Sequence, residues 1–173
     1  MGFFEAVATC FKKYATFSGR ARRREYWFFA IFNTIIVLPL FIWFFIGMFA
    51  SIFRLHAMNA SELQSLRHMS ESQFLDFFAN LFDVSVWLPL LLILLYSLII
   101  LLPTIAVSVR RMHDIGRSGA YFLLSFIPYV GGIIWLVLTV LDGQPGDNEY
   151  GPDPKAPPKS EHEPPKDGLG ATL

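Results

Sequence analysis

The sequence predicts an all-α, polytopic membrane protein. Its 173 residues are 54% hydrophobic and only 16% charged, whereas an ordinary soluble domain carries about 25% charged residues. Three long apolar runs, residues 26–53, 84–109 and 121–141, contain no Asp, Glu, Lys, Arg or His. Because a helix needs about 20 apolar residues to cross a bilayer, we expect three transmembrane helices.

Two polar segments flank this membrane part, which spans residues 26–141. Residues 1–25 form an amphipathic, Arg-rich lead, in which apolar residues at helical spacing predict a short helix lying on the membrane surface. Packing of that stripe against a neighbouring span is the alternative. Residues 142–173 form a Pro-rich polar tail that we expect to be disordered from about Lys155.

The connection between the first two runs, residues 54–83, contains a second amphipathic pattern. Ser70 is placed to cap a helix whose phenylalanines recur at helical spacing. We therefore expect a helix that begins after Ser70 and leads into the second span.

The distribution of basic residues predicts the orientation. Residues 1–25 carry six Lys and Arg residues and residues 110–120 carry three, whereas residues 54–83 carry only two. The positive-inside rule therefore places the N-terminus and the 110–120 connection in the cytoplasm. With three crossings, the tail would lie outside.

The third run leaves an alternative open. Pro128, followed by Gly131 and Gly132, can bend a helix or return it as a re-entrant hairpin. In that case the tail would lie on the same side as the arginines, and its acidic residues would meet them. A single crossing remains the main expectation because 21 apolar residues suffice.

Arginines dominate the cytoplasmic side. Guanidinium groups bind phosphate in a bidentate way, and anionic lipid headgroups are the nearest phosphates. The candidates for anion or lipid binding are Arg20, Arg23, Arg24, Arg110, Arg111 and Arg117. The alternative is that these residues only set the topology. Glu25 and Asp114 are the only acids beside them, and we expect both to pair with arginines.

The neighbouring His113 and Asp114 suggest a general base, but adjacent residues seldom face each other and no nucleophile accompanies them. The four histidines show no metal-ligand spacing. We therefore expect no enzyme activity, no metal and no cofactor. Three polar or aromatic residues have structural roles: Asn33 joins helices, Trp27 lies at the interface, and Ser118 caps the third run after a turn at Gly116.

Four stretches, FSGRARRREYWFF, LPTIAVSVRRMHDIGRSGAYFLL, IPYVGG and GQPGDNEYGPDP, occur in order between residues 17 and 154. Together they resemble domain-of-unknown-function family 805, the YhaH-like small bacterial inner-membrane proteins. The resemblance covers about residues 11–155 and implies a multi-pass plasma-membrane protein without established activity. Its motif also includes Asn148 and Asp153. The long connection 54–83 and the extended tail depart from the short members of the family.

These observations predict a non-enzymatic assembly or scaffold protein whose cytoplasmic arginines contact anionic lipid. Its expected partners are membrane lipids and a second copy or another membrane protein, and we expect no nucleic acid. A transporter or permease accessory subunit is the alternative function. A membrane enzyme that uses His113 and Asp114 is a third.

Overall fold

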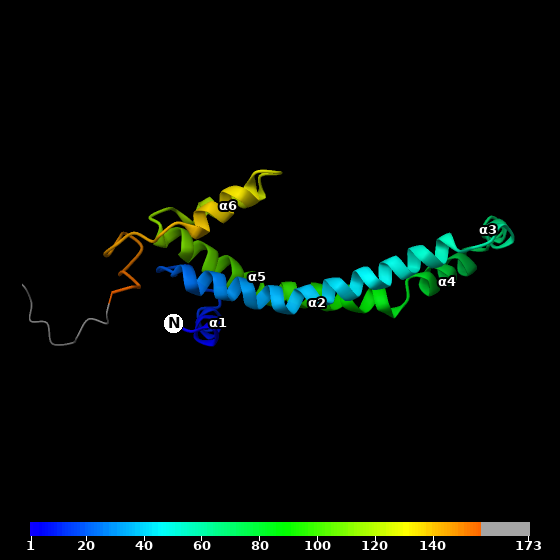
Figure 1. The fold of residues 1–173 in the computed structure, drawn as a ribbon, viewed down its shortest axis with the longest axis horizontal. Helices are drawn as coiled ribbons and strands as arrows, with labels where there is room; N and C mark the ends of the chain where they lie inside the picture. Colours follow the sequence, from blue (N-terminus) through cyan, green and yellow to red (C-terminus); the bar gives the residue numbers. More distant parts are fainter. Residues whose placement is uncertain (157–173) are drawn as a thin grey trace, which may run out of the picture. The chain divides into compact units, whose positions relative to one another are not determined.

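The computed structural model describes residues 1–156, which form two compact units. The first unit joins residues 1–16 to residues 24–107, and the second joins residues 17–23 to the chain from residue 108 onward. Within residues 1–156 every regular element is a helix, which confirms the all-α prediction (Figure 1). The expected disorder of the tail concerns residues that lie largely outside the described range.

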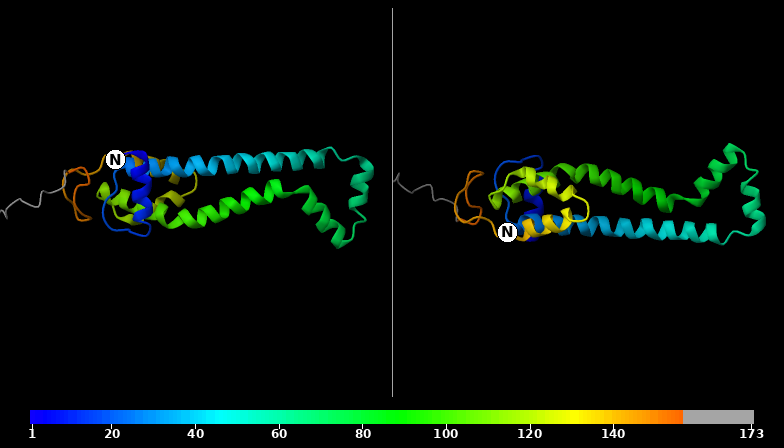
Figure 2. Two further views of the ribbon diagram at one scale, coloured as in Figure 1. Left: turned by 90° about the horizontal axis from the view of Figure 1, so that it is seen from below. Right: turned by 90° about the horizontal axis from the view of Figure 1, so that it is seen from above.

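Two long helices dominate the first unit. Helix α2 spans Arg23–His56 and helix α5 spans Val84–Asp114, and both are long and apolar enough to cross a membrane. Their portions within this unit run side by side in opposite directions (Figure 2). Most of their side chains are apolar and exposed, as expected for helices that lipid surrounds. The first two predicted spans therefore correspond to real helices.

The two helices approach each other closely through small residues. An added Cβ at Gly47 of α2 would lie 2.7 Å from the main-chain oxygen of Ser85 at the start of α5. One turn further along α2, the Ser51 hydroxyl donates to the carbonyl of Leu81 at 2.6 Å. Small residues let helix backbones approach in this way, so this end of α2 is held against the segment that leads into α5.

The predicted amphipathic lead is helix α1, Phe3–Lys12. Its apolar stripe packs on α2: the ring centroids of Phe3 and Phe28 lie 5.7 Å apart, and those of Phe11 and Phe29 are equally close. Phe4 on the outer face remains exposed. Packing against a neighbouring span, the alternative in the sequence analysis, therefore accounts for most of the stripe.

Helices α3, Ala60–Leu66, and α4, Glu71–Leu81, fill the connection between α2 and α5. Each begins with a capping box, in which Asn59 or Ser70 accepts a hydrogen bond from the third residue of its helix. The prediction of a helix capped by Ser70 is confirmed.

The third apolar run does not form the expected single helix. It divides into the 3₁₀ helix η1, Gly119–Phe126, and the short helix α6, Gly131–Val140. An added Cβ at Gly131 would lie 2.6 Å from the carbonyl oxygen of Leu124, so only glycine lets α6 start against η1. Ten helical residues extend about 15 Å, half the hydrocarbon thickness of about 30 Å. The expectation of three transmembrane helices is therefore corrected, within residues 1–156, to two helices of spanning length followed by a hairpin.

We expect Gly47→Ala to destabilise the protein, because the added methyl group would force α2 away from the backbone at Ser85. Gly132→Ala is the matched control, since its Cβ would meet nothing within 4 Å and alanine favours a helix by about 1 kcal/mol. Thermal unfolding of the detergent-purified protein measures both. The close-approach account fails if Gly47→Ala unfolds at the same temperature as the unaltered chain or higher.

Candidate functional site

The polar residues of the second unit gather at the end of α5. Arg110 and Arg111 are both completely buried, and Asp114 is 2% exposed. Charged side chains are almost never buried to this extent unless they are paired. Two buried arginines and a buried aspartate therefore cluster at the end of α5.

Asp114 holds two arginines from different parts of the sequence. Its Oδ1 lies 3.0 Å from Nε of Arg20, and its Oδ2 lies 2.6 Å from Nη1 of Arg111. Arg111 and Asp114 are three residues apart on α5 and therefore share a helix face. Arg20 comes from the lead, before α2 begins. We call Arg20, Arg111 and Asp114 the Asp114 clamp.

The same two arginines also bind the last turn of α6 and the chain that follows it. Arg111 donates from Nε to the carbonyl oxygen of Thr139 at 3.1 Å and from Nη2 to that of Leu141. Arg20 donates to the carbonyl oxygens of Gln144 and Gly146. A helix leaves its last carbonyls without partners inside the helix and carries a negative dipole end there. Arg111 therefore supplies both hydrogen bonds and positive charge where α6 ends.

The carbonyls at the end of α5 are satisfied by three separate segments. Ala21 of the lead donates its N–H to the carbonyl of Arg110 at 3.0 Å. The turn at Gly116, with φ +69°, brings the N–H of Arg117 within 2.9 Å of the carbonyl of Met112. After α6, Asn148 Nδ2 donates to the carbonyl of His113 at 2.9 Å, and the N–H of Gln144 donates to that of Asp114 at 2.8 Å.

The tail motif, residues 143–154, packs on His113. Asn148 and Gly151 exchange two main-chain hydrogen bonds, and the Tyr150 ring of this turn stacks on the His113 ring with centroids 4.0 Å apart and planes 4° from parallel. His113 Nδ1 lies 3.2 Å from the carbonyl oxygen of Gly19. The side chains of His113 and Asp114 thus have different partners.

Asp153 fixes the far end of this turn. Its carboxylate accepts the N–H groups of Lys155 at 2.8 Å and of Gly146 at 3.0 Å. These main-chain hydrogen bonds lower the pKa of Asp153, and the positive charges of Arg20 and Lys155 lower it slightly further, although burial acts in the opposite direction. The carboxylate that holds the tail turn is therefore ionised at neutral pH.

Gly143 is required by the clamp itself. An added Cβ at this position would lie 2.2 Å from Oδ2 of Asp114, the oxygen that Arg111 holds. The carboxylate cannot move aside without leaving one of its arginines. The sequence analysis did not select Gly143, Gln144 or Tyr150, although all three belong to the motif GQPGDNEYG.

The remaining candidate arginines are exposed. Arg23 forms an ion pair with Asp142 at 2.7 Å, and the guanidinium carbon of Arg117 lies 5.6 Å from the Tyr121 ring centroid. Arg24 is also exposed. Ser118 caps η1 by accepting the N–H of Ala120, as predicted. Of the six arginines considered for lipid binding, three are buried and these three face outward.

Three predicted polar or aromatic residues lie in the first unit. Asn33 of α2 accepts a hydrogen bond from the Tyr96 hydroxyl of α5 at 2.7 Å, which confirms its role in joining helices. Trp27 lies edge-on to Tyr26, with ring centroids 5.6 Å apart. Glu25 is 3% exposed, so it belongs to the buried part of the chain.

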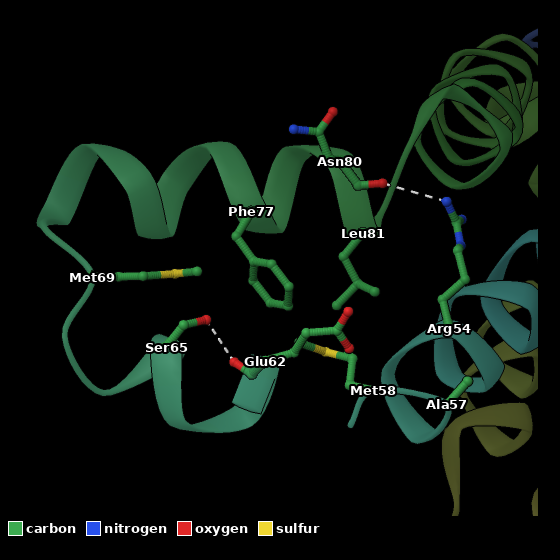
Figure 3. Close-up of a pocket in the computed structure, with 9 residues that line it drawn as sticks. All are labelled: Arg54, Ala57, Met58, Glu62, Ser65, Met69, Phe77, Asn80 and Leu81. Carbon is green, nitrogen blue, oxygen red and sulfur yellow. Dashed lines mark hydrogen bonds between the residues drawn. The ribbon is translucent and has the colours of Figure 1, made fainter. Parts of the chain in front are cut away.

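A separate hollow of about 580 Å³ lies in the first unit between α3, α4 and the end of α2 (Figure 3). Its charged residues have partners of their own, since Arg54 contacts Asp83 at 3.2 Å and Glu62 accepts the N–H of Asn59 at 2.9 Å. The hollow therefore offers mainly apolar surface. The residues that line it are Arg54, Ala57, Met58, Glu62, Ser65, Met69, Phe77, Asn80 and Leu81.

Two apolar helices of membrane-spanning length, together with a buried ionic clamp where α5 ends, define a small helical membrane protein. The chain belongs to the family of proteins of unknown function DUF805, whose model matches residues 14–152. This family assignment confirms the resemblance seen in the sequence. The matched range contains the whole Asp114 clamp and the Asn148–Gly151 turn.

Two curated relatives come from Escherichia coli K12. Inner membrane protein YhaI is 34% identical over 144 residues, which cover 83% of this chain and 90% of the relative. Inner membrane protein YhaH is 31% identical over 147 residues, covering 85% and 93%. No solved structure matches the chain. Both relatives are named as inner membrane proteins.

We expect Asp114→Asn to cost about 3–5 kcal/mol of stability, because the change removes the charge that two buried arginines share. Asp83→Asn is the matched control: Asp83 also pairs with an arginine, Arg54, but both side chains are more than 40% exposed. Such exposed pairs contribute about 0–1 kcal/mol. Unfolding temperature and abundance in the membrane report both effects, and equal losses in the two variants would contradict a clamp stabilised by burial.

Proposed function

We propose that this chain is a non-enzymatic assembly protein of the inner membrane, with the Asp114 clamp as its structural centre and exposed arginines as its contacts to anionic lipid. The observation that carries the proposal is the mutual binding of the motif residues. Arg20, Arg111 and Asp114 bind one another and the main chain, as does Asn148. Groups engaged in this way act to hold the fold rather than to turn over a substrate.

The same contacts support two crossings of the membrane. Arg20 precedes α2, and Asp114 ends α5, yet their side chains are bonded. If α2 crosses the membrane, α5 must cross back. Arg20 also binds the carbonyl of Gln144, beyond α6, so the segment between α5 and Gln144 enters and returns on one side. The lead and the tail motif therefore share a side of the membrane.

The distribution of basic residues supports a cytoplasmic location for that side. The lead carries Lys12, Lys13 and its arginines, and Arg117 adds a further exposed charge. The α2–α5 connection carries only Arg54 and Arg67, together with four acidic residues. By the positive-inside rule, the clamp and both ends of the described chain face the cytoplasm.

In this proposal the exposed arginines are the residues that contact lipid. Arg24 and Arg117 present guanidinium groups next to helices that enter the membrane, while Arg23 is partly neutralised by Asp142. A basic residue near an anionic membrane surface contributes about 1 kcal/mol of attraction. Buried Arg20, Arg110 and Arg111 are not available to headgroups in this arrangement. The lipid-binding proposal therefore rests on fewer residues than the sequence suggested.

Assembly with a second copy is supported by the outer surfaces of α2 and α5. These helices expose long apolar faces, and Thr34 adds a hydroxyl that is bonded within α2 to the carbonyl of Ala30 at 2.9 Å. Packing between such faces joins helices in membranes. Native mass spectrometry of the protein released from nanodiscs would show a discrete oligomer. Monomers alone would remove the assembly part of the proposal.

We expect Arg24→Gln and Arg117→Gln, each made singly, to reduce the phosphatidylglycerol and cardiolipin that co-purify with the protein. Each change removes one exposed positive charge on the cytoplasmic side. Arg67→Gln is the matched control, because it removes one exposed arginine from the opposite connection. Lipid retention is read by native mass spectrometry. Equal retention in all three variants, or an equal loss, would contradict lipid recognition by the cytoplasmic arginines.

A further inference from the structure

The η1–α6 hairpin, residues 119–140, is held at its base by the end of α5. Arg111 binds the carbonyls of Thr139 and Leu141, and Asp114 accepts the N–H of Gln144. At its other end, an added Cβ at Gly119 would lie 2.7 Å from Val109 of α5. Both ends of the hairpin therefore contact the end of α5.

Beyond this base the hairpin presents apolar side chains on almost every side. Residues 119–141 include no charged residue, and large side chains point outward along both arms: Leu123, Phe126, Ile133, Leu136 and Val137 are each more than half exposed. A contiguous apolar surface of this kind marks an interaction site. Charged residues occur only at its borders, where Arg117 and Asp142 lie.

Two hydroxyl groups and the main chain of the turn are hydrogen-bonded within the hairpin. The Ser125 hydroxyl donates to the carbonyl of Phe122 at 2.7 Å, and the Thr139 hydroxyl donates to that of Leu136 at 3.0 Å. At the turn, the N–H of Val130 reaches the carbonyl of Pro128, and the N–H of Gly131 reaches that of Ile127, both at 2.8 Å. Internal satisfaction of this kind suits an environment without water.

The length of the hairpin matches one leaflet. Its ten-residue α6 extends about 15 Å, which is half of a hydrocarbon core of about 30 Å. Tyr129 occupies the turn, with φ +66° and a side chain that is 99% exposed. From a base at headgroup level, the turn reaches the middle of the bilayer and not the opposite surface.

We propose that the η1–α6 hairpin inserts into the leaflet on the side of the Asp114 clamp, where lipid acyl chains cover its apolar surface. The exposed Arg117 at its base complements anionic headgroups. The hairpin adds volume to one leaflet only. This proposal does not depend on which side of the membrane the clamp occupies, nor on whether the chain assembles.

Depth-dependent fluorescence quenching tests the insertion. Single cysteines replace Val130 at the turn, Ile133 on α6 and Ser118 at the base, in a Cys10→Ala background, and each is labelled with bimane. The labelled proteins enter vesicles whose lipids carry a nitroxide at acyl carbon 5 or carbon 12. All three positions are exposed, and unchanged unfolding temperatures verify that each labelled protein keeps its fold, including the Ser118→Cys variant, which loses the cap of η1.

We expect the label at Val130→Cys to lose more emission to the carbon-12 nitroxide than to the carbon-5 nitroxide. The label at Ser118→Cys should show the reverse order, and Ile133→Cys should fall between them. Quenching at Val130→Cys by aqueous iodide, with no effect of either lipid, would overturn the proposal. So would efficient Val130→Cys crosslinking between two copies without lipid quenching, because the occupant would then be a second chain.

Discussion

The fold of the second unit depends on one buried carboxylate. Asp114 lies between Arg20 and Arg111 with all three side chains withdrawn from solvent, and charges buried in this way are tolerated only when they are paired and hydrogen-bonded. The clamp meets this requirement by binding main-chain carbonyls at the end of α6 and in the segment after it. Three segments therefore depend on one another. The lead supplies Arg20, the end of α5 supplies Arg111 and Asp114, and the tail motif supplies main-chain carbonyls that Arg20 binds.

The hairpin is a consequence of the same constraint. Composition and length alone favour a third crossing over residues 121–141, since the run is long enough and carries no charge. In the structure this run instead divides into η1 and α6, and Arg111 binds the carbonyls of Thr139 and Leu141, 28 and 30 residues further along the chain. Contacts between side chains and distant carbonyls leave no periodic pattern in a sequence, so only the Pro128–Gly132 break indicated the return.

Local signals were more informative than long-range ones. The apolar runs predicted α2 and α5, and Ser70 and Ser118 were placed as helix caps because their side chains act within three residues of themselves. The sequence also predicted an arginine partner for Asp114. The sequence did not reveal that Arg20 and Arg111 are buried. An Arg-rich segment has the same sequence pattern whether its side chains bind phosphate or an internal carboxylate. For the same reason Gly143, whose place beside Asp114 depends on the fold, was not selected.

The central claim is that the lead and the tail motif lie on one side of the membrane because the Asp114 clamp joins them. Single cysteines at Ser18, Lys155 and Ser61, in a Cys10→Ala background, test it by labelling intact cells with an impermeant maleimide. The account predicts that Ser61→Cys is labelled in intact cells, whereas Ser18→Cys and Lys155→Cys are labelled only after the cells are opened. Labelling of Lys155→Cys together with Ser61→Cys in intact cells would contradict it, because the third run would then cross the membrane and the clamp could not form.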